Sequence, residues 1–276
     1  YYALDVIYDK VLIQKYCDKL PIEFQYKKEV ITKKNITEMM RSQMFDLVNE
    51  ASLQLEALIG LKVTIHIKYF TDLENITNIT IDLSDFTETV NTFSTLLTEI
   101  VNPNITSITL VNNAGRLGKI SNLENLKPSD ISKTIQLNTT TPLILSSLFI
   151  KLTELLTCKK QIINISSGAA KNPYQGWSIY CTSKAAIDMM TRSIATEQSE
   201  IKNGVKCVAI YPGVVDTNMQ SQIRNTDKNN FNSLQRFVDL KENNELYTPD
   251  FVAESIYNID TENQLQSGGI IDIRNF

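Results

Sequence analysis

The sequence predicts an α/β fold: a doubly wound parallel sheet with helices on both faces, formed as a single domain by residues 1–276. Short apolar runs at residues 107–111, 161–165 and 205–210 alternate with segments whose apolar residues recur at helical spacing. These runs lack the polar alternation of a strand with one wet face, so we expect strands that are buried on both sides. We expect about seven parallel strands in all, with a ligand site at their carboxyl ends.

The composition narrows the class of protein. The chain has 42% hydrophobic residues and a net charge of −4, which suits a buried core and argues against a nucleic-acid partner. No apolar run reaches the roughly 18 residues of a membrane span and no signal peptide is visible, so we expect no membrane contact and a cytoplasmic location. The 4 cysteines are scattered and only 1 histidine accompanies them, which predicts neither a metal site nor a disulfide framework.

Residues 1–60 are the least typical part of the predicted fold. Residues 29–32 are a candidate short strand, and an apolar stripe at helical spacing over residues 40–58 predicts a crossover helix. Residues 62–69 alternate strictly between polar and apolar side chains, as a strand does. Gly60 is the only glycine before Gly115, so a glycine-rich turn that would let backbone N–H groups approach a pyrophosphate is missing.

The elements become clearer from residue 79 onward. Residues 79–82 predict a further strand. Asp85 is a candidate cap for an amphipathic helix over residues 86–100, in which apolar side chains recur every three or four positions. A helical region then follows over residues 128–156, broken near Pro142. This order matches the strand–helix alternation of the expected fold.

The second half of the chain repeats the alternation. A helix follows the strand at 161–165, because apolar residues recur at helical spacing over residues 185–194. Residues 249–259 predict the last helix, and residues 268–273 predict a closing strand. Residues 218–247 are polar with scattered apolar side chains, and we interpret them as a mobile pair of short helices that forms a substrate lid. A surface insertion without a gating role is the alternative.

The candidate catalytic residues lie around the strand at 161–165. This strand delivers Ser167 to a loop, and Tyr180 and Lys184 follow one turn apart on the same face of a helix. A phenol has an ordinary pKa of about 10, and a nearby ammonium is expected to lower it toward the working range of a general acid. Ser167 can hydrogen-bond the same substrate oxygen. The three residues suit the reduction of a carbonyl, although a Tyr-x-x-x-Lys pair by itself is common in surface helices.

These residues resemble the short-chain dehydrogenase/reductase family, and the similarity runs from about residue 79 to the C-terminus. The motifs that carry it are Asp82-Leu83, Leu110-Val111-Asn112-Asn113-Ala114-Gly115, Asn138, Ser167 with Tyr180 and Lys184, and Tyr211-Pro212-Gly213-Val214-Val215-Asp216-Thr217. The resemblance implies a Rossmann-like fold, NADPH as the cofactor and a homodimer. It implies that Asn138, Ser167, Tyr180 and Lys184 are catalytic, Asn138 through a bound water, although a helix-capping role for Asn138 stays open. It implies that the cofactor is held by Asp82, Leu83, Asn112, Asn113, Ala114, Gly115, Tyr180, Lys184, Pro212, Gly213, Val215 and Thr217.

A finer resemblance points to the branch of the family that contains sepiapterin reductases and fungal benzil reductases. It rests on Asn113-Ala114-Gly115-Arg116-Leu117-Gly118, Gly176-Trp177, Tyr180-Cys181 and Asp216-Thr217-Asn218-Met219-Gln220. The branch implies a small-molecule carbonyl substrate held by Ser167, Gly168, Trp177, Tyr180, Met219 and Asp272. Reduction of the side-chain ketone of a pterin, in tetrahydrobiopterin biosynthesis, is the leading expectation, with a diketone or general carbonyl as the alternative. Asp272 would anchor the guanidine-like edge of the pterin; a role in capping the last strand is equally open.

The sequence departs from the family at its N-terminus, where the pattern T-G-x-x-x-G-x-G is not found. Three explanations compete: a diverged loop that still binds the cofactor, an N-terminus that is lost or replaced in this sequence, or a catalytically silent binding protein. The sequence alone does not separate them.

Overall fold

The computed structural model describes residues 79, 81–102, 104–262 and 265–275. The residues from Asp82 onward belong to one compact unit. The strands expected at residues 29–32 and 62–69, and the helix expected over residues 40–58, lie outside the described residues.

The described part of the chain contains a 4-stranded parallel sheet in the order β1-β2-β3-β4. Its strands are β1 (Ser107–Asn112), β2 (Lys159–Ile165), β3 (Lys206–Tyr211) and β4 (Ile270–Asp272). In the two central strands Ile162, Val208 and Ile210 are 0% exposed, as expected for strands covered on both faces. The prediction of a parallel α/β sheet is therefore confirmed.

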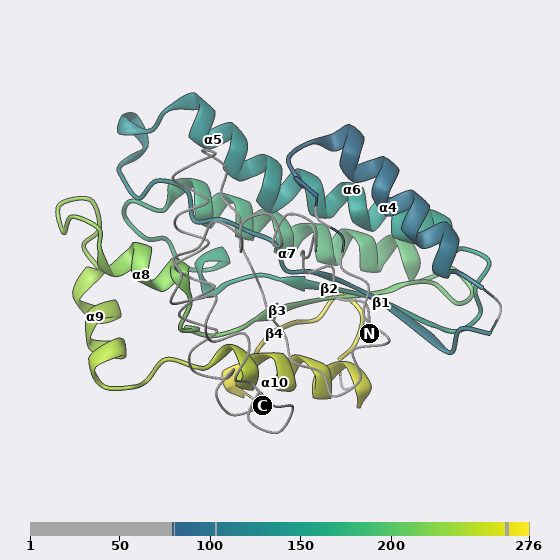
Figure 1. The fold of residues 1–276 in the computed structure, drawn as a ribbon. Helices are drawn as coiled ribbons and strands as arrows, with labels where there is room; N and C mark the ends of the chain where they lie inside the picture. The colour runs from purple at the N-terminus through teal and green to yellow at the C-terminus, as the bar shows by residue number, and fades with distance from the viewer. Residues whose placement is uncertain (1–78, 80, 103, 263–264, 276) are drawn as a thin grey trace, which may run out of the picture. The chain divides into compact units, whose positions relative to one another are not determined.

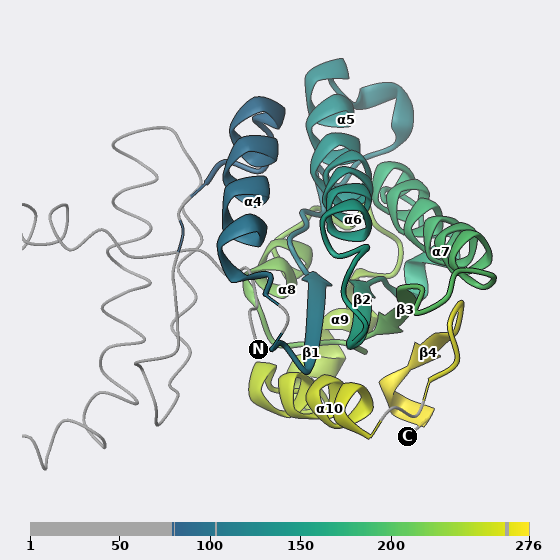
Figure 2. The same cartoon turned by 90° about the vertical axis from the view of Figure 1, so that its right-hand side faces the viewer.

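Helices cover both faces of this sheet (Figures 1 and 2). One face carries α4 (Phe86–Ile100), α6 (Thr141–Leu152) and α7 (Ser178–Gln198), and the other carries α10 (Pro249–Thr261). The segment α5 (Pro128–Ile135) runs into α6 through a π-helical turn (Gln136–Thr140). Two short helices, α8 (Asn218–Arg224) and α9 (Leu234–Glu242), follow β3 and lie beyond the carboxyl ends of the strands. They fall within the segment predicted as a lid.

Local signals explain where several helices begin and end. The Asp85 carboxylate accepts a hydrogen bond from the backbone N–H of Glu88 at 3.0 Å, which caps α4 as predicted. Phe93 and Leu97 on the buried face of α4 are 5% and 3% exposed, and α4 packs against α6. Helix α6 ends at Leu152 rather than at residue 156, because the Thr153 hydroxyl and N–H both bond to the carbonyl of Phe149 and close the last turn.

One predicted strand does not form in the described residues. Ile79, Ile81 and Asp82 carry no strand structure, whereas the prediction placed a strand over residues 79–82. Parallel strands are held by hydrogen bonds to neighbours, and within the described residues β1 pairs only with β2. An apolar run identifies a candidate strand, but pairing decides whether the ladder exists.

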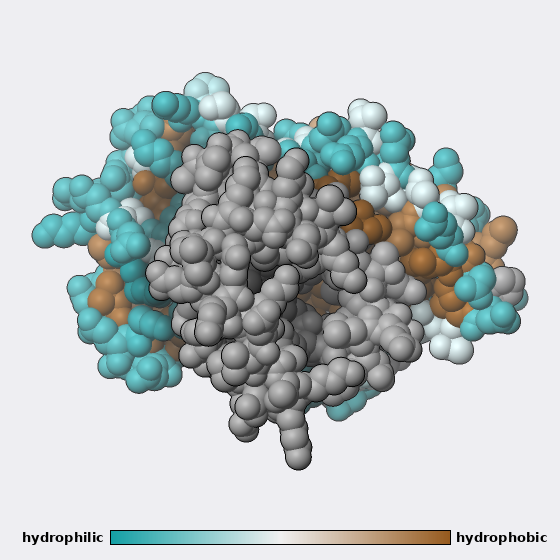
Figure 3. All heavy atoms as spheres, in the orientation of Figure 1, coloured by the Kyte–Doolittle hydropathy of each residue, from teal (hydrophilic) through white to brown (hydrophobic). Residues whose placement is uncertain are grey.

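The hydropathy of the surface differs between the two ends of the sheet. Figure 3 shows hydrophilic side chains gathered over α5, α8 and α9, at the carboxyl ends of the strands. Hydrophobic side chains gather at the opposite end of that view. Leu155 and Ile201, which belong to the loops that precede β2 and β3, are 93% and 53% exposed. Among the described helices, none has the length and apolar character needed to cross a membrane.

Candidate active site

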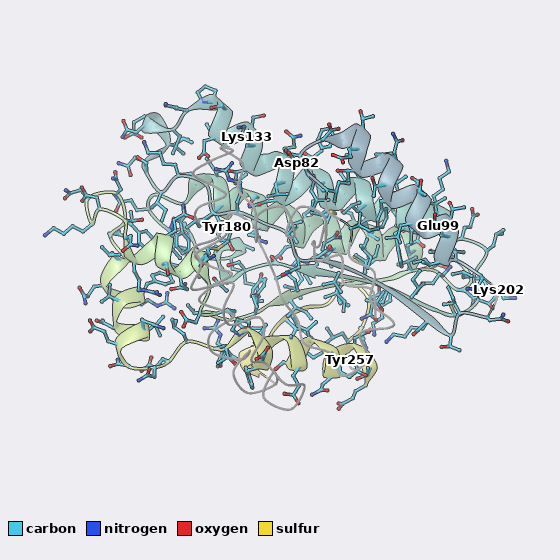
Figure 4. The ribbon with its side chains drawn as sticks, viewed as in Figure 1. Asp82, Glu99, Lys133, Tyr180, Lys202 and Tyr257 are labelled. Atoms are coloured by element: carbon cyan, nitrogen blue, oxygen red, sulfur yellow. The ribbon has the colours of Figure 1, made fainter. Side chains whose placement is uncertain are left out.

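The predicted catalytic residues meet beyond the carboxyl end of β2. The strand ends at Ile165, and Ser166 and Ser167 lead into a short 3-10 turn (Gly168–Ala170) before α7 begins at Ser178. Tyr180 therefore lies in the first turn of α7, at the end of that helix nearer α8 (Figure 4). The fold brings a strand end and a helix start together, as the sequence predicted.

Ser167 and Tyr180 contact each other. The Ser167 hydroxyl hydrogen-bonds the Tyr180 phenol and also accepts a hydrogen bond from the backbone N–H of Ala169 at 3.1 Å. Beside them, a Cβ added at Gly168 would meet no heavy atom of the described residues within 4 Å.

Burial sets the proton affinity of Tyr180. The side chain is 8% exposed, and burial raises its pKa to about 12, an effect that the hydrogen bond from Ser167 opposes. We expected the ammonium of Lys184 to lower this pKa, and that expectation is wrong for this structure because desolvation of the phenolate dominates. The phenol is therefore fully protonated at neutral pH, which is the state that a general acid needs.

Lys184 lies over the ring of Tyr180. Its Nζ is 5.8 Å from the centroid of the Tyr180 ring and donates a hydrogen bond to the carbonyl oxygen of Ile165 at 2.7 Å. The side chain is buried, and burial lowers the pKa of Lys184 to about 8, while the carboxylate of Asp188 acts to raise it. The Lys184 amine therefore titrates close to neutral pH.

Asn138 completes the constellation from a different element. It lies inside the π-helical turn, is 1% exposed, and grips the backbone of Arg116 with two hydrogen bonds of 2.8 Å. Its amide also donates to the hydroxyl of Ser183 at 3.0 Å. These hydrogen bonds join Asn138 to Arg116 and Ser183 and not to the first N–H groups of its own helical turn. Asn138 is therefore not a helix cap. Single π-helical turns often mark functional sites.

The last residue of β1 is buried, and the three residues after it are exposed. The Asn112 amide is 8% exposed and donates to the Asn164 side chain at 2.8 Å, which ties the ends of β1 and β2 together. Asn113, Ala114 and Gly115 are exposed. A Cβ at Gly115 would lie 3.4 Å from Oδ1 of Asn138 and 3.7 Å from Nζ of Lys184, so the backbone here passes close to both side chains.

Other predicted cofactor residues follow β3 or precede α4. Pro212, Gly213 and Val215 are half-buried and Thr217 is exposed. Gly213 adopts a φ of +72°, and a Cβ there would lie 2.7 Å from Cε2 of Tyr247. At the other side, the carbonyl of Leu83 accepts a hydrogen bond from the Thr141 hydroxyl at 2.8 Å, and Asp82 is exposed beside it.

These segments fit a dinucleotide. A cofactor needs backbone that can be approached closely, and the exposed turn that ends at Gly115 supplies it directly beside Lys184. Asp82, Asn113 and Thr217, which were predicted to hold the cofactor, have exposed side chains. No group of three or more His, Cys, Asp or Glu side chains that could hold a metal ion occurs among the described residues.

Helices α8 and α9 pack on an aromatic cluster that includes Tyr180. The Trp177 ring stacks on Phe231 with centroids 4.8 Å apart and meets Tyr180 edge-on at 5.7 Å. Phe237 lies 5.4 Å from Trp177, and the partly buried Met219 packs against the same cluster. The structure therefore places Trp177 and Met219, both predicted to bind substrate, in the same cluster as Tyr180.

Asp272 is already engaged by a neighbour. Nε of Arg274 donates to Oδ1 of Asp272 at 2.8 Å, Nη2 pairs with Oδ2, and the Arg274 backbone N–H donates to Oδ1 at 3.1 Å. These hydrogen bonds hold the pKa of Asp272 below its usual range. Of the two roles left open by the sequence, the capping contact is the one that the structure contains; the ligand role remains a prediction.

Sequence reasoning missed three residues of this site. Asn164 links the strands, Asp188 is a buried carboxylate one turn after Lys184, and Arg274 pairs with Asp272. For Asp188 a signal existed, because a carboxylate falls between Ile187 and Met190 on the apolar face of the predicted helix. A charged residue on an apolar face needs hydrogen-bond or charge partners. The position of Asp188 could therefore have identified it as a candidate site residue.

Comparisons with known proteins agree with this geometry. The family model described as short chain dehydrogenase matches residues 62–228. A benzil reductase ((S)-benzoin forming) of Bacillus cereus is 48% identical over 139 residues, which cover 50% of this chain and 56% of that protein. A sepiapterin reductase of Meriones unguiculatus is 37% identical over 115 residues, covering 41% of each chain.

A solved structure shows the same fold. The KRED1-Pglu enzyme superimposes with a TM-score of 0.60 at 27% identity, covering 70% of this chain and 78% of its own. The chain spans about half the length of the curated relatives it matches, at 56% and 60% for two benzil reductases. Because the family model covers more than half of the sequence and the strand, turn and helix motifs meet at one site, the chain belongs to the short-chain dehydrogenase family.

Proposed function

We propose that the protein is an NADPH-dependent carbonyl reductase that converts a ketone of a small molecule into an alcohol. When bound, NADPH supplies the hydride that reduces the carbonyl carbon. The observation that carries the proposal is the meeting of the Tyr180 phenol, the Ser167 hydroxyl and the Lys184 ammonium at the start of α7. Membership of the short-chain dehydrogenase family supports it.

Each residue has a distinct task in the proposed reaction. Tyr180 is the general acid: with a pKa of about 12 it keeps its proton until negative charge develops on the substrate oxygen, and then donates it. Ser167 orients the carbonyl and hydrogen-bonds the same oxygen. Lys184 places positive charge near the phenolate that remains, and Asn138 supports the relay that returns a proton to Tyr180.

An uncharged diketone of the benzil type is the first candidate substrate. Two observations favour it over a pterin. The carboxylate of Asp272, which would face the guanidine-like edge of a pterin, is paired with the guanidinium of Arg274. The benzil reductases of Bacillus cereus and Bacillus subtilis are 48% and 43% identical to this chain over the matched residues, whereas the sepiapterin reductase of Meriones unguiculatus is 37% identical.

The side-chain ketone of a pterin is the second candidate. It is favoured by the position of Asp272, which ends β4 opposite Tyr211 at the carboxyl edge of the sheet. Its pKa is held low, so it is ionised and suited to a charge-assisted pair. A pterin would have to displace Arg274 from this carboxylate, a step that a diketone does not need.

A catalytically silent binding protein is the competing function, motivated by the missing glycine-rich turn in residues 1–60. A titration that follows the fluorescence of NADPH separates the two. Saturable binding supports the reductase, whereas no binding at millimolar cofactor supports the silent alternative.

The decisive assay follows NADPH oxidation with benzil and with sepiapterin. Tyr180→Phe removes the donated proton and keeps the ring, so kcat is expected to fall by at least about 100-fold while NADPH affinity changes little. Glu197→Gln, an exposed change on the same helix, serves as the control. Turnover that survives in Tyr180→Phe would refute the assignment of the general acid.

We also propose a homodimer that forms through α6 and α7. Leu143 on α6 and Met189 on α7 support this, because these apolar side chains are 51% and 60% exposed. Light scattering coupled to size-exclusion chromatography tests it. A mass of 31.3 kDa at every concentration would contradict the proposal.

A further inference from the structure

A buried carboxylate lies one helical turn beyond Lys184. Asp188 is 5% exposed, and its two oxygens accept hydrogen bonds from two hydroxyl groups. The Ser166 hydroxyl donates to Oδ1 at 2.6 Å, and the Tyr211 phenol donates to Oδ2. Ser166 directly precedes the catalytic Ser167, and Tyr211 directly precedes Pro212-Gly213. One carboxylate therefore ties α7 to the ends of β2 and β3.

The network supplies a hydroxyl donor to each oxygen of the carboxylate. Burial, together with the hydrogen bond to Asp188 and its negative charge, raises the pKa of Tyr211, so this phenol stays protonated and donates. The hydroxyl of Ser166 also lies 3.3 Å from the carbonyl oxygen of Lys184, within the same turn of α7. An ionised group with this little contact with water needs such donors or a positive charge nearby.

Lys184 lies one helical turn before Asp188 on α7, and the negative charge of Asp188 acts to raise the pKa of Lys184. Around the Lys184 ammonium, α7 presents Tyr180 and Asp188, β2 presents the carbonyl of Ile165, and the π-helical turn presents the neutral amide of Asn138. Near Tyr211, two further cations act: Arg192 on α7, and Lys171, whose Nζ lies 5.2 Å from the centre of the Tyr211 ring. Asp188 is the carboxylate of this set that stabilises the charged form of Lys184.

We propose that Asp188 is a positioning residue of the reductase: it keeps Lys184 protonated, and it fixes the loop that carries Ser167 and the loop that carries Gly213. The inference rests on the proposed carbonyl reduction, since it gives the residue a task in that reaction. A residue that served packing alone would not need an ionisable group with both oxygens engaged and a lysine one turn away.

The test changes the charge of residue 188 and nearly nothing else. Asp188→Asn keeps the size and one acceptor oxygen but removes the negative charge that favours the ammonium form of Lys184. The pKa of Lys184 is therefore expected to fall below its value of about 8, by about 1 or more. Asp188→Glu restores the charge and is expected to return the pKa toward that of the parent. Glu197→Gln, on the exposed side of α7, is the matched control.

The primary readout is carbon NMR of protein labelled at the ε-carbon of lysine, titrated with pH. Lys184→Met identifies the signal by its loss. This measurement needs no turnover, so it stands even if benzil and sepiapterin both prove not to be substrates, an outcome that would count against the proposed function alone. Where the parent is active, the alkaline limb of kcat/KM should move to lower pH in Asp188→Asn by the same amount as the Lys184 titration.

The variant Asp188→Leu/Tyr211→Phe covers the case in which Asp188→Asn does not fold. It replaces the carboxylate and one of its donors by apolar groups, which is often tolerated where removal of one partner is not. The same fall in the Lys184 pKa is expected. An unchanged Lys184 titration in a folded variant of either kind overturns the proposal, as does a fall in thermal stability without any shift of the pH profile.

Discussion

The pair formed by Arg274 and Asp272 predicts how the site chooses between substrates. In this pair Nε and Nη2 of Arg274 both bond to the carboxylate, and the side chains are 49% and 15% exposed. A pterin that binds Asp272 must first break this pair, whereas an uncharged diketone leaves it intact. Arg274→Met removes the guanidinium and keeps the aliphatic stem, so it frees the carboxylate with little change in packing.

The expected magnitude follows from the exposure of the pair. A hydrogen bond to a charged group contributes about 1.5–3 kcal/mol when it is sheltered, and the half-exposed guanidinium reduces this to about 1 kcal/mol. Removing that competition should raise kcat/KM for sepiapterin about fivefold and change kcat/KM for benzil by less than about twofold. Steady-state assays with both substrates measure the two changes, with Lys133→Met, a change of an exposed cation on α5, as the control.

The result that would refute this reasoning is a parallel change. If Arg274→Met alters the rates with sepiapterin and benzil by the same factor, the pair does not discriminate between substrates and Asp272 is a purely structural cap. A selective loss of sepiapterin turnover would be equally damaging, because it would mean that Arg274 itself binds the pterin.

Two further predictions concern backbone strain and pH. Gly213→Ala should destabilise the fold by about 1–2 kcal/mol in urea unfolding, because φ is +72° and the new methyl group would lie 2.7 Å from Tyr247; unchanged stability would show that the turn relaxes. The pKa of Lys184 is lowered from 10.5 to about 8 in the folded state, so between these values the unfolded chain binds more protons and this residue makes stability rise with pH. Lys184→Met lacks this titration, so its free energy of unfolding should rise less with pH in this range than that of the parent. Identical slopes in parent and variant would contradict the burial of the charge.

The sequence by itself determined the elements that depend on local pattern. Apolar runs predicted β1, β2 and β3, the Asp85 cap predicted the start of α4, and helical spacing placed Tyr180 and Lys184 on one face of α7. Each of these follows from residues within a turn or a strand of one another, where side-chain direction is set by the backbone. Among the described residues of the segment 79–82, Ile79, Ile81 and Asp82 carry no strand structure, and a ladder depends on a partner that no local pattern contains.

Only the tertiary structure decided the electrostatics of the site. The pKa of Tyr180 depends on how completely the surrounding elements exclude water, and burial by the lid-side aromatic cluster outweighed the expected effect of Lys184. The contacts of Asp188 join α7 to two strands, and the grip of Asn138 on Arg116 joins a π-helical turn to a loop well before it in the chain. Such effects arise from distances and desolvation between segments remote in sequence, and spacing along the chain carries no measure of either.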